Sequence, residues 1–210
     1  VLIALRYALP YIFNKLATHD GKHLLGDPVY LNERHVLGTY KDLHGNVSPT
    51  SDDAYKYQYS LSAWIYINPQ PPSTSAAYSS FAPLLSYGGK PTIEYNGKTN
   101  ELRVTTDAGK NKDGSTKIVT LASTKNVQYQ KWNNFVINYD GANMDVFING
   151  ELVGTKPNIA PYMSLDDVVA GAPNGVHGGI CNVVYYDRTL SRGSIALTYR
   201  TLRDKSTPIL

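Results

Sequence analysis

Apolar and polar side chains alternate along much of the chain, and this period of two predicts antiparallel β-strands. Residues 57–67 give the clearest example, because every second residue is apolar: Tyr59, Leu61, Ala63, Ile65 and Ile67. The residues between them are assigned to the opposite face: Ser60, Ser62, Trp64 and Tyr66. We therefore predict a strand with one face packed on a hydrophobic core.

The stretch from Trp132 to Gly154 contains apolar runs joined by turn-forming pairs. Asp140-Gly141 and Asn149-Gly150 favour tight hairpin turns, because such turns need positive φ angles that Gly, Asn and Asp adopt at low cost. The pattern predicts three consecutive antiparallel strands, a meander.

Further short strands are predicted between turn residues, at residues 36–43, 81–87, 92–95, 102–106, 117–121 and 166–170. Residues 68–80 are expected to form a long loop, because their prolines lack the N–H that a central strand needs. Residues 107–115 are expected to form a polar loop.

One segment, residues 191–203, carries a convincing helix pattern. Ser191 is suited to the N-cap, and Ile195, Tyr199 and Leu202 fall on one face at helical spacing. We predict a short C-terminal helix with one apolar face.

Length and composition fit one all-β domain. The chain has 210 residues, and its 17 tyrosines are typical of half-buried strand positions. The net charge of +3 is small and the basic residues form no block, which argues against nucleic acid as a partner. Cys181 is the single cysteine, so the chain cannot form an internal disulfide.

The most apolar run lies at residues 1–13, ahead of a polar, irregular segment. It is shorter than the roughly 20 residues of a membrane-spanning helix, and the chain starts with Val1, so we expect a fragment or a processed chain. Two interpretations stay open: the end of a membrane anchor, or a segment packed on the domain or on a partner. The residues expected to make the membrane or assembly contact are Leu2, Ile3, Leu5, Tyr7, Tyr11, Ile12 and Phe13.

Three stretches together resemble laminin-G-like domains of the concanavalin A-like lectin/glucanase superfamily. They are residues 59–67 with Trp64, residues 132–154, and residues 178–191, which look like the family's closing strand and the start of the helix after it. The resemblance covers roughly residues 36–202 and implies an all-β, two-sheet antiparallel jelly-roll sandwich with one short C-terminal helix. We accordingly expect a hydrophobic arm and linker at residues 1–35 and the laminin-G-like domain at residues 36–210.

The sequence offers no catalytic constellation. Glycosidases of this superfamily place two carboxylates on one strand, facing the substrate groove. The acidic pairs here lack that arrangement, since they flank turns or are expected to point to opposite faces: Asp140 with Asp145, Asp166 with Asp167, and Glu94 with Glu101. We predict no catalytic residue and no enzymatic activity, and a degenerate glycoside hydrolase is the least favoured alternative.

Metal binding is also disfavoured. His19 and His23 are four residues apart, but Gly21 lies between them and no second pair follows. The loop at residues 107–115 offers oxygen ligands for calcium, but it also carries lysines. In the closing strand, Cys181 and Asn182 replace the acids that the resemblance implies for calcium-binding relatives. We therefore predict no cofactor, with calcium as the disfavoured candidate.

The resemblance favours a non-catalytic recognition or structural module that is anchored to a membrane or an assembly through residues 1–13. Similar domains occur in cell-surface proteins and among minor structural proteins of large DNA virus particles, and the free cysteine favours the virion setting. The expected partners are other proteins of the assembly or a glycan. The alternative is a carbohydrate-binding, lectin-like domain of a cell-surface or secreted protein, for which the sequence identifies no ligand-binding residue.

Overall fold

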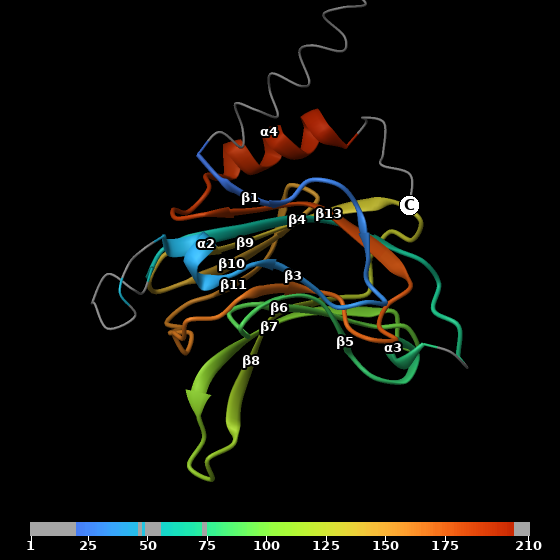
Figure 1. Ribbon diagram of the computed structural model, residues 1–210, viewed down its shortest axis with the longest axis horizontal. Coiled ribbons are helices and arrows are strands. Elements are labelled where there is room, and N and C mark those ends of the chain that lie inside the picture. The colour runs from blue at the N-terminus through green and yellow to red at the C-terminus, as the bar shows by residue number, and fades with distance from the viewer. Residues whose placement is uncertain (1–19, 46–47, 49–55, 73–74, 204–210) are drawn as a thin grey trace, which may run out of the picture.

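The computed structural model describes residues 20–45, 48, 56–72 and 75–203, and within them it confirms the predicted two-sheet antiparallel sandwich (Figure 1). Sheet A has seven strands, ordered β1 (Lys22–Leu25), β13 (Gly178–Tyr186), β4 (Tyr59–Ile67), β9 (Trp132–Tyr139), β10 (Met144–Ile148) and β11 (Glu151–Lys156), with β2 (Val29–Tyr30) also paired to β13. Sheet B has six, ordered β3 (His35–Gly38), β12 (Val168–Ala170), β5 (Ala82–Tyr87), β6 (Thr92–Asn96), β7 (Glu101–Lys110) and β8 (Thr116–Thr124).

The core lies between the sheets, and β4 supplies it as its alternation predicted. The five apolar residues of that face are all buried: Tyr59, Leu61, Ala63, Ile65 and Ile67. Side chains from sheet B meet them from the other side, among them Leu85, Val104 and Ala170. Burial of two such apolar faces against each other is the main force that holds a sandwich together.

The predicted meander is confirmed as β9, β10 and β11, which are neighbours in sheet A. Asn149 and Gly150, between β10 and β11, have φ angles of 53° and 81°. At the other turn, the Asp140 carboxylate accepts hydrogen bonds from the backbone N–H groups of Ala142 and Asn143, at 2.9 and 2.6 Å. The turn residues that predicted the hairpins therefore also fix their geometry.

The predicted C-terminal helix is confirmed as α4 (Arg192–Leu202), which lies over the outer face of sheet A (Figure 1). Ser191 caps it, because its hydroxyl accepts from the N–H of Ser194 at 3.1 Å. Ile195 is 1% exposed and packs on side chains of sheet A such as Phe147. The helix also explains why Trp64, on the outer face of β4, is only 6% exposed: its ring stacks on Tyr199 with 6.0 Å between the centroids.

The N-terminal segment differs from the prediction in two places. Part of the expected linker, residues 22–25 and 29–30, forms β1 and β2 on the edge of sheet A, where both pair with β13. The strand predicted at residues 36–43 ends at Gly38, because Thr39 and Asp42 form a capping box that starts α2 (Tyr40–His44). Strands and helices this short leave almost no periodic signal in a sequence.

Two loops also contain more structure than predicted. Residues 68–80 include the short helix α3 (Ala76–Ser79). Strand β7 continues to Lys110 and β8 starts at Thr116, so the polar loop expected at residues 107–115 is shortened to residues 111–115, the tip of a β-hairpin that projects from the sandwich (Figure 1).

The hydrophobic arm at residues 1–13 lies outside the described residues, so its contacts stay a prediction. Within the described ranges, no helix combines the length and the apolar character needed to cross a membrane.

Candidate functional site

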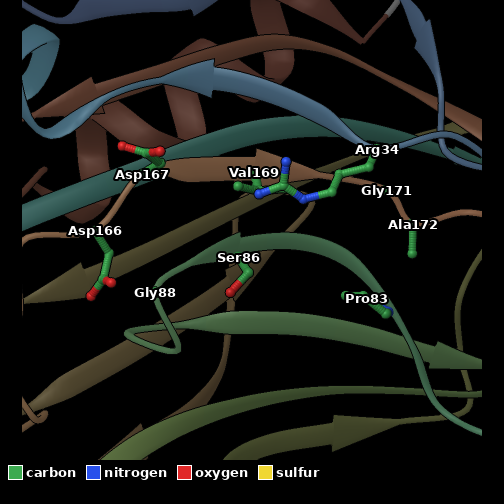
Figure 2. A pocket seen from close by; sticks show the side chains of 9 residues that line it. All are labelled: Arg34, Pro83, Ser86, Gly88, Asp166, Asp167, Val169, Gly171 and Ala172. Carbon is green, nitrogen blue, oxygen red and sulfur yellow. The ribbon is translucent and has the colours of Figure 1, made fainter.

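A pocket of about 440 Å³ opens on the outer face of sheet B, where β3, β12 and β5 run side by side. Val169 of β12 and Ser86 of β5 are register partners and both point outward, whereas Val168 and Ala170 point into the core. Figure 2 shows the side chains that line the pocket: Arg34, Pro83, Ser86, Asp166, Asp167, Val169 and Ala172, together with the backbone of Gly88 and Gly171.

Backbone hydrogen bonds hold the segment that carries Arg34 against the end of β12. The N–H of Ala172 donates to the carbonyl of Leu31 at 3.2 Å, and the N–H of Gly171 donates to the carbonyl of Leu84 at 3.0 Å. Gly171 has a φ of 66°, and a side chain there would collide with the carbonyl of Leu31, 2.7 Å from the position of its Cβ. Glycine at this position allows three distant segments to meet at the pocket.

Asp166, on one side of the pocket, is held by a buried lysine. Lys90 is 0% exposed, and its ammonium donates to Oδ2 of Asp166 at 2.6 Å and to the carbonyl of Ser164 at 2.9 Å. It also lies 4.5 Å from the centroid of the Tyr87 ring. The hydroxyl of Ser164 adds a further hydrogen bond to the same carboxylate oxygen.

These contacts shift both pKa values. Burial lowers the pKa of Lys90, against the opposing effect of the Asp166 carboxylate. Partial burial raises the pKa of Asp166, but the hydrogen bonds from Lys90 and Ser164 outweigh it, so the pKa of this carboxyl lies below its ordinary value of 3.8. Asp166 is therefore ionised at neutral pH.

Gly88 makes room for this carboxylate. Its φ is 53°, and a Cβ at this position would overlap the side chain of Asp166. A glycine in the turn after β5 is thus a condition for Asp166 to reach its place beside the pocket.

Asp167 lines the pocket from the segment just before β12. Its Oδ1 accepts a hydrogen bond at 3.2 Å from the backbone N–H of Tyr40, the first residue of α2. The expectation that Asp166 and Asp167 point to opposite faces of a strand was wrong, because β12 begins only at Val168. Both acids precede the strand and line the same pocket.

The other acidic pairs from the sequence have separate structural roles. Glu94 forms an ion pair with Arg103 at 2.7 Å. Asp145 accepts a hydrogen bond from the Thr155 hydroxyl at 2.6 Å, and Asp140 fixes its turn as described above.

In the part of the chain that the structure describes, no group of three or more His, Cys, Asp or Glu is placed to hold a metal ion. In the projecting hairpin, Asp107 and Asp113 accept backbone hydrogen bonds within their own turns, from Gly109 and Ser115. Cys181 is buried, and burial raises the pKa of its thiol to about 12. His19 lies outside the described residues.

The sequence did not identify this pocket. Arg34, Ser86 and the pair of aspartates come from three separate segments that meet only through the strand order β3-β12-β5. The one signal in the sequence that could have pointed to the pocket was a set of polar residues at outward strand positions. Such residues are common on any solvent-exposed face of a sheet, so they do not identify a pocket.

The two packed antiparallel sheets define a jelly-roll sandwich. A family model described as the concanavalin A-like lectin/glucanases superfamily matches residues 38–196, and the chain belongs to this family. The resemblance predicted from the sequence is confirmed. None of the curated proteins matches this chain.

Several solved structures share the fold. The binding domain of Paraclostridial Mosquitocidal Protein 1 matches with a TM-score of 0.57 at 11% identity, over 87% of this chain and 52% of that one. The ligand binding domain of botulinum neurotoxin serotype D, in complex with N-acetylneuraminic acid, matches with a TM-score of 0.52 at 16% identity, over 70% of this chain and 37% of that one. The receptor binding domain of the botulinum neurotoxin C/D mosaic serotype matches at 15% identity with the same score and coverage. The chain thus spans about half or less of these proteins, and at these identities the likeness concerns the fold.

Proposed function

We propose that this domain is a non-catalytic recognition module that binds a glycan in the pocket on sheet B. The observation that carries the proposal is the combination of charged hydrogen-bonding groups, Arg34, Asp166 and Asp167, with the apolar surfaces of Pro83 and Val169 in one pocket. A sugar ring presents hydroxyl groups that donate and accept, and C–H faces that pack on apolar surface. The pocket offers a partner to each kind of group.

The comparisons support the proposal in two respects. The superfamily is described as one of lectins and glucanases, and the similar structures are binding domains of toxins, one of them in complex with N-acetylneuraminic acid. That neurotoxin is a longer protein of low sequence identity to this chain, so its ligand cannot be transferred directly. The proposal of a glycan ligand for this chain is therefore based on the pocket itself.

The state of Asp166 supports a binding role rather than glycoside hydrolysis. A glycosidase needs one carboxyl with a raised pKa that can donate a proton to the leaving group. The pKa of Asp166 is shifted in the opposite direction, because Lys90 and Ser164 stabilise its charged form. Its neighbour Asp167 is tied to the backbone of Tyr40.

Binding of the chain to a printed glycan array tests the proposal, with the pocket blocked in a variant. Ser86→Trp would fill the pocket from an outward position on β5, and we expect it to abolish the array signal. Ser123→Trp is the matched control, because Ser123 faces outward on β8 at the far edge of the same sheet. Signals that survive Ser86→Trp, or that Ser123→Trp removes equally, would contradict the assignment of this pocket.

A structural role in a membrane-bound or virion assembly is the second candidate, and the apolar run at residues 1–13 favours it. In this case, the full chain should co-sediment with phosphatidylcholine vesicles or with its assembly, and deletion of residues 1–13 should release it. Equal sedimentation of the full and shortened chains would refute the anchor. A membrane-associated, virion or cell-surface location belongs to this candidate, whereas a secreted location is the alternative and belongs with the glycan-binding function.

A further inference from the structure

The charged groups around the pocket also indicate which class of sugar it takes. We propose that the pocket selects a neutral, hydroxyl-rich sugar and discriminates against acidic sugars such as N-acetylneuraminic acid. This inference rests on the proposed glycan-binding function and narrows it.

The first observation is that two carboxylates each offer a free oxygen at the pocket. Oδ2 of Asp166 is taken by Lys90 and Ser164, whereas its Oδ1 has no hydrogen-bond partner among the described residues. Oδ1 of Asp167 is taken by Tyr40, which leaves Oδ2 without such a partner. Ionised carboxylates only accept hydrogen bonds, so the ligand must bring donors, and sugar hydroxyls are donors.

The second observation concerns the positive charges. Lys90 is fully buried behind Asp166 and already committed to it, so its charge does not face the ligand. Arg34 is exposed, lines the pocket, and makes no side-chain hydrogen bond to any described residue, so its donors are free for ligand oxygens. The side chains that face the ligand therefore carry two negative charges and one positive charge.

An acidic sugar would bring a third carboxylate next to the first two, and Arg34 alone could not compensate for it. Two like charges about 4 Å apart in water repel enough to weaken binding about five-fold, and more where the pocket excludes water. A cationic ligand would be repelled by Arg34, and the attraction of Asp166 for it is weakened, because that carboxylate is already bonded to Lys90. A neutral sugar uses the donors and acceptors of the pocket without either penalty.

A glycan array tests this inference if each neutral oligosaccharide is printed beside its sialylated form and an amine-bearing form. The comparison uses only glycans whose signal is abolished by Ser86→Trp. For these glycans, we expect the neutral form to give a signal at least about five-fold stronger than the sialylated form. Because the discrimination is electrostatic, it should shrink in 1 M NaCl, where charges are screened over about 3 Å.

Asp167→Asn provides the matched variant, because asparagine keeps the shape and the acceptor for Tyr40 but removes the negative charge. We expect about ten-fold weaker binding of the neutral form and a smaller gap to the sialylated form. The near-ultraviolet circular dichroism of the variant checks its fold, and the salt series on the wild-type chain decides the question if the variant unfolds.

The outcomes separate the two proposals. A Ser86-dependent signal that is equal or stronger for sialylated or amine-bearing forms would overturn the neutral-sugar inference and leave glycan binding intact. Discrimination that is unchanged in 1 M NaCl would also overturn it. The absence of any Ser86-dependent glycan signal would refute the proposed function itself.

Discussion

Asp166→Asn should destabilise the domain more than Lys90→Met, although the two residues form a single ion pair. Lys90 is 0% exposed, whereas the side chain of Asp166 is 35% exposed. Removal of the carboxylate leaves an ammonium group in the interior without its counter-charge, which costs about 3–5 kcal/mol. Removal of the ammonium leaves a carboxylate that water can reach, and we expect a smaller loss of about 1–3 kcal/mol.

Urea unfolding monitored by tryptophan fluorescence measures the free energy of unfolding of each variant. Trp64 and Trp132 lie on adjacent strands of sheet A, so their surroundings change when the sheet unfolds. The double variant Lys90→Met with Asp166→Asn should cost less than the sum of the single changes, since neither charge is left alone. Glu94→Gln is the control, because it breaks a partly exposed ion pair with Arg103 and should cost about 1 kcal/mol or less. Equal losses for the two single variants, or strict additivity in the double variant, would refute the reasoning.

Three further predictions concern other parts of the domain. Ile195→Ala should cost about 2–4 kcal/mol in urea unfolding, because it removes a buried contact of α4, whereas the exposed Leu197→Ala should change stability by less than about 0.5 kcal/mol. The Cys181 thiol, whose pKa burial raises to about 12, should react with Ellman's reagent at pH 8 only after urea is added; rapid reaction of the native protein would contradict its burial. Hydrogen bonds from Asn143 lower the pKa of Asp140 below its ordinary value of 3.8, so this carboxylate stabilises the fold above that pH and stops doing so as the pH falls through its folded-state pKa. The Asp140→Asn variant should therefore lose less stability on acidification than the wild type. Parallel profiles of stability against pH for the two proteins would contradict this prediction.

The sequence predicted the fold wherever its signals were local. The alternation at residues 57–67 and the turn pairs around the meander each depend on neighbouring residues, so they predicted β4, β9, β10 and β11. The capping residue and spacing of α4 are local in the same way. The prediction failed at β1, β2 and α2, which have two to five residues and depend on long-range pairing or on a cap.

The candidate site could not be predicted from the sequence, because it depends on register. The side chains of Arg34, Ser86 and Asp166 line one pocket because β12 pairs with β3 on one side and with β5 on the other. The role of Lys90 was equally hidden, because its sequence neighbours give no sign that its ammonium is buried beside Asp166. From the sequence alone, a polar residue on a strand that lines a pocket cannot be distinguished from one on a solvent-exposed surface.

The hairpin of β7 and β8 extends beyond the sandwich, and its tip is held by bonds within itself (Figure 1). The Asn111 amide donates to the Ser115 hydroxyl at 2.9 Å, and the N–H of Ser115 donates to Asp113 at 2.9 Å. A peptide tag or a fluorophore attached at Lys112 would thus interrupt no contact with the core. Since β6 separates this hairpin from the strands of the pocket, a chain immobilised through the tip on a sensor surface would keep the pocket open to the solution.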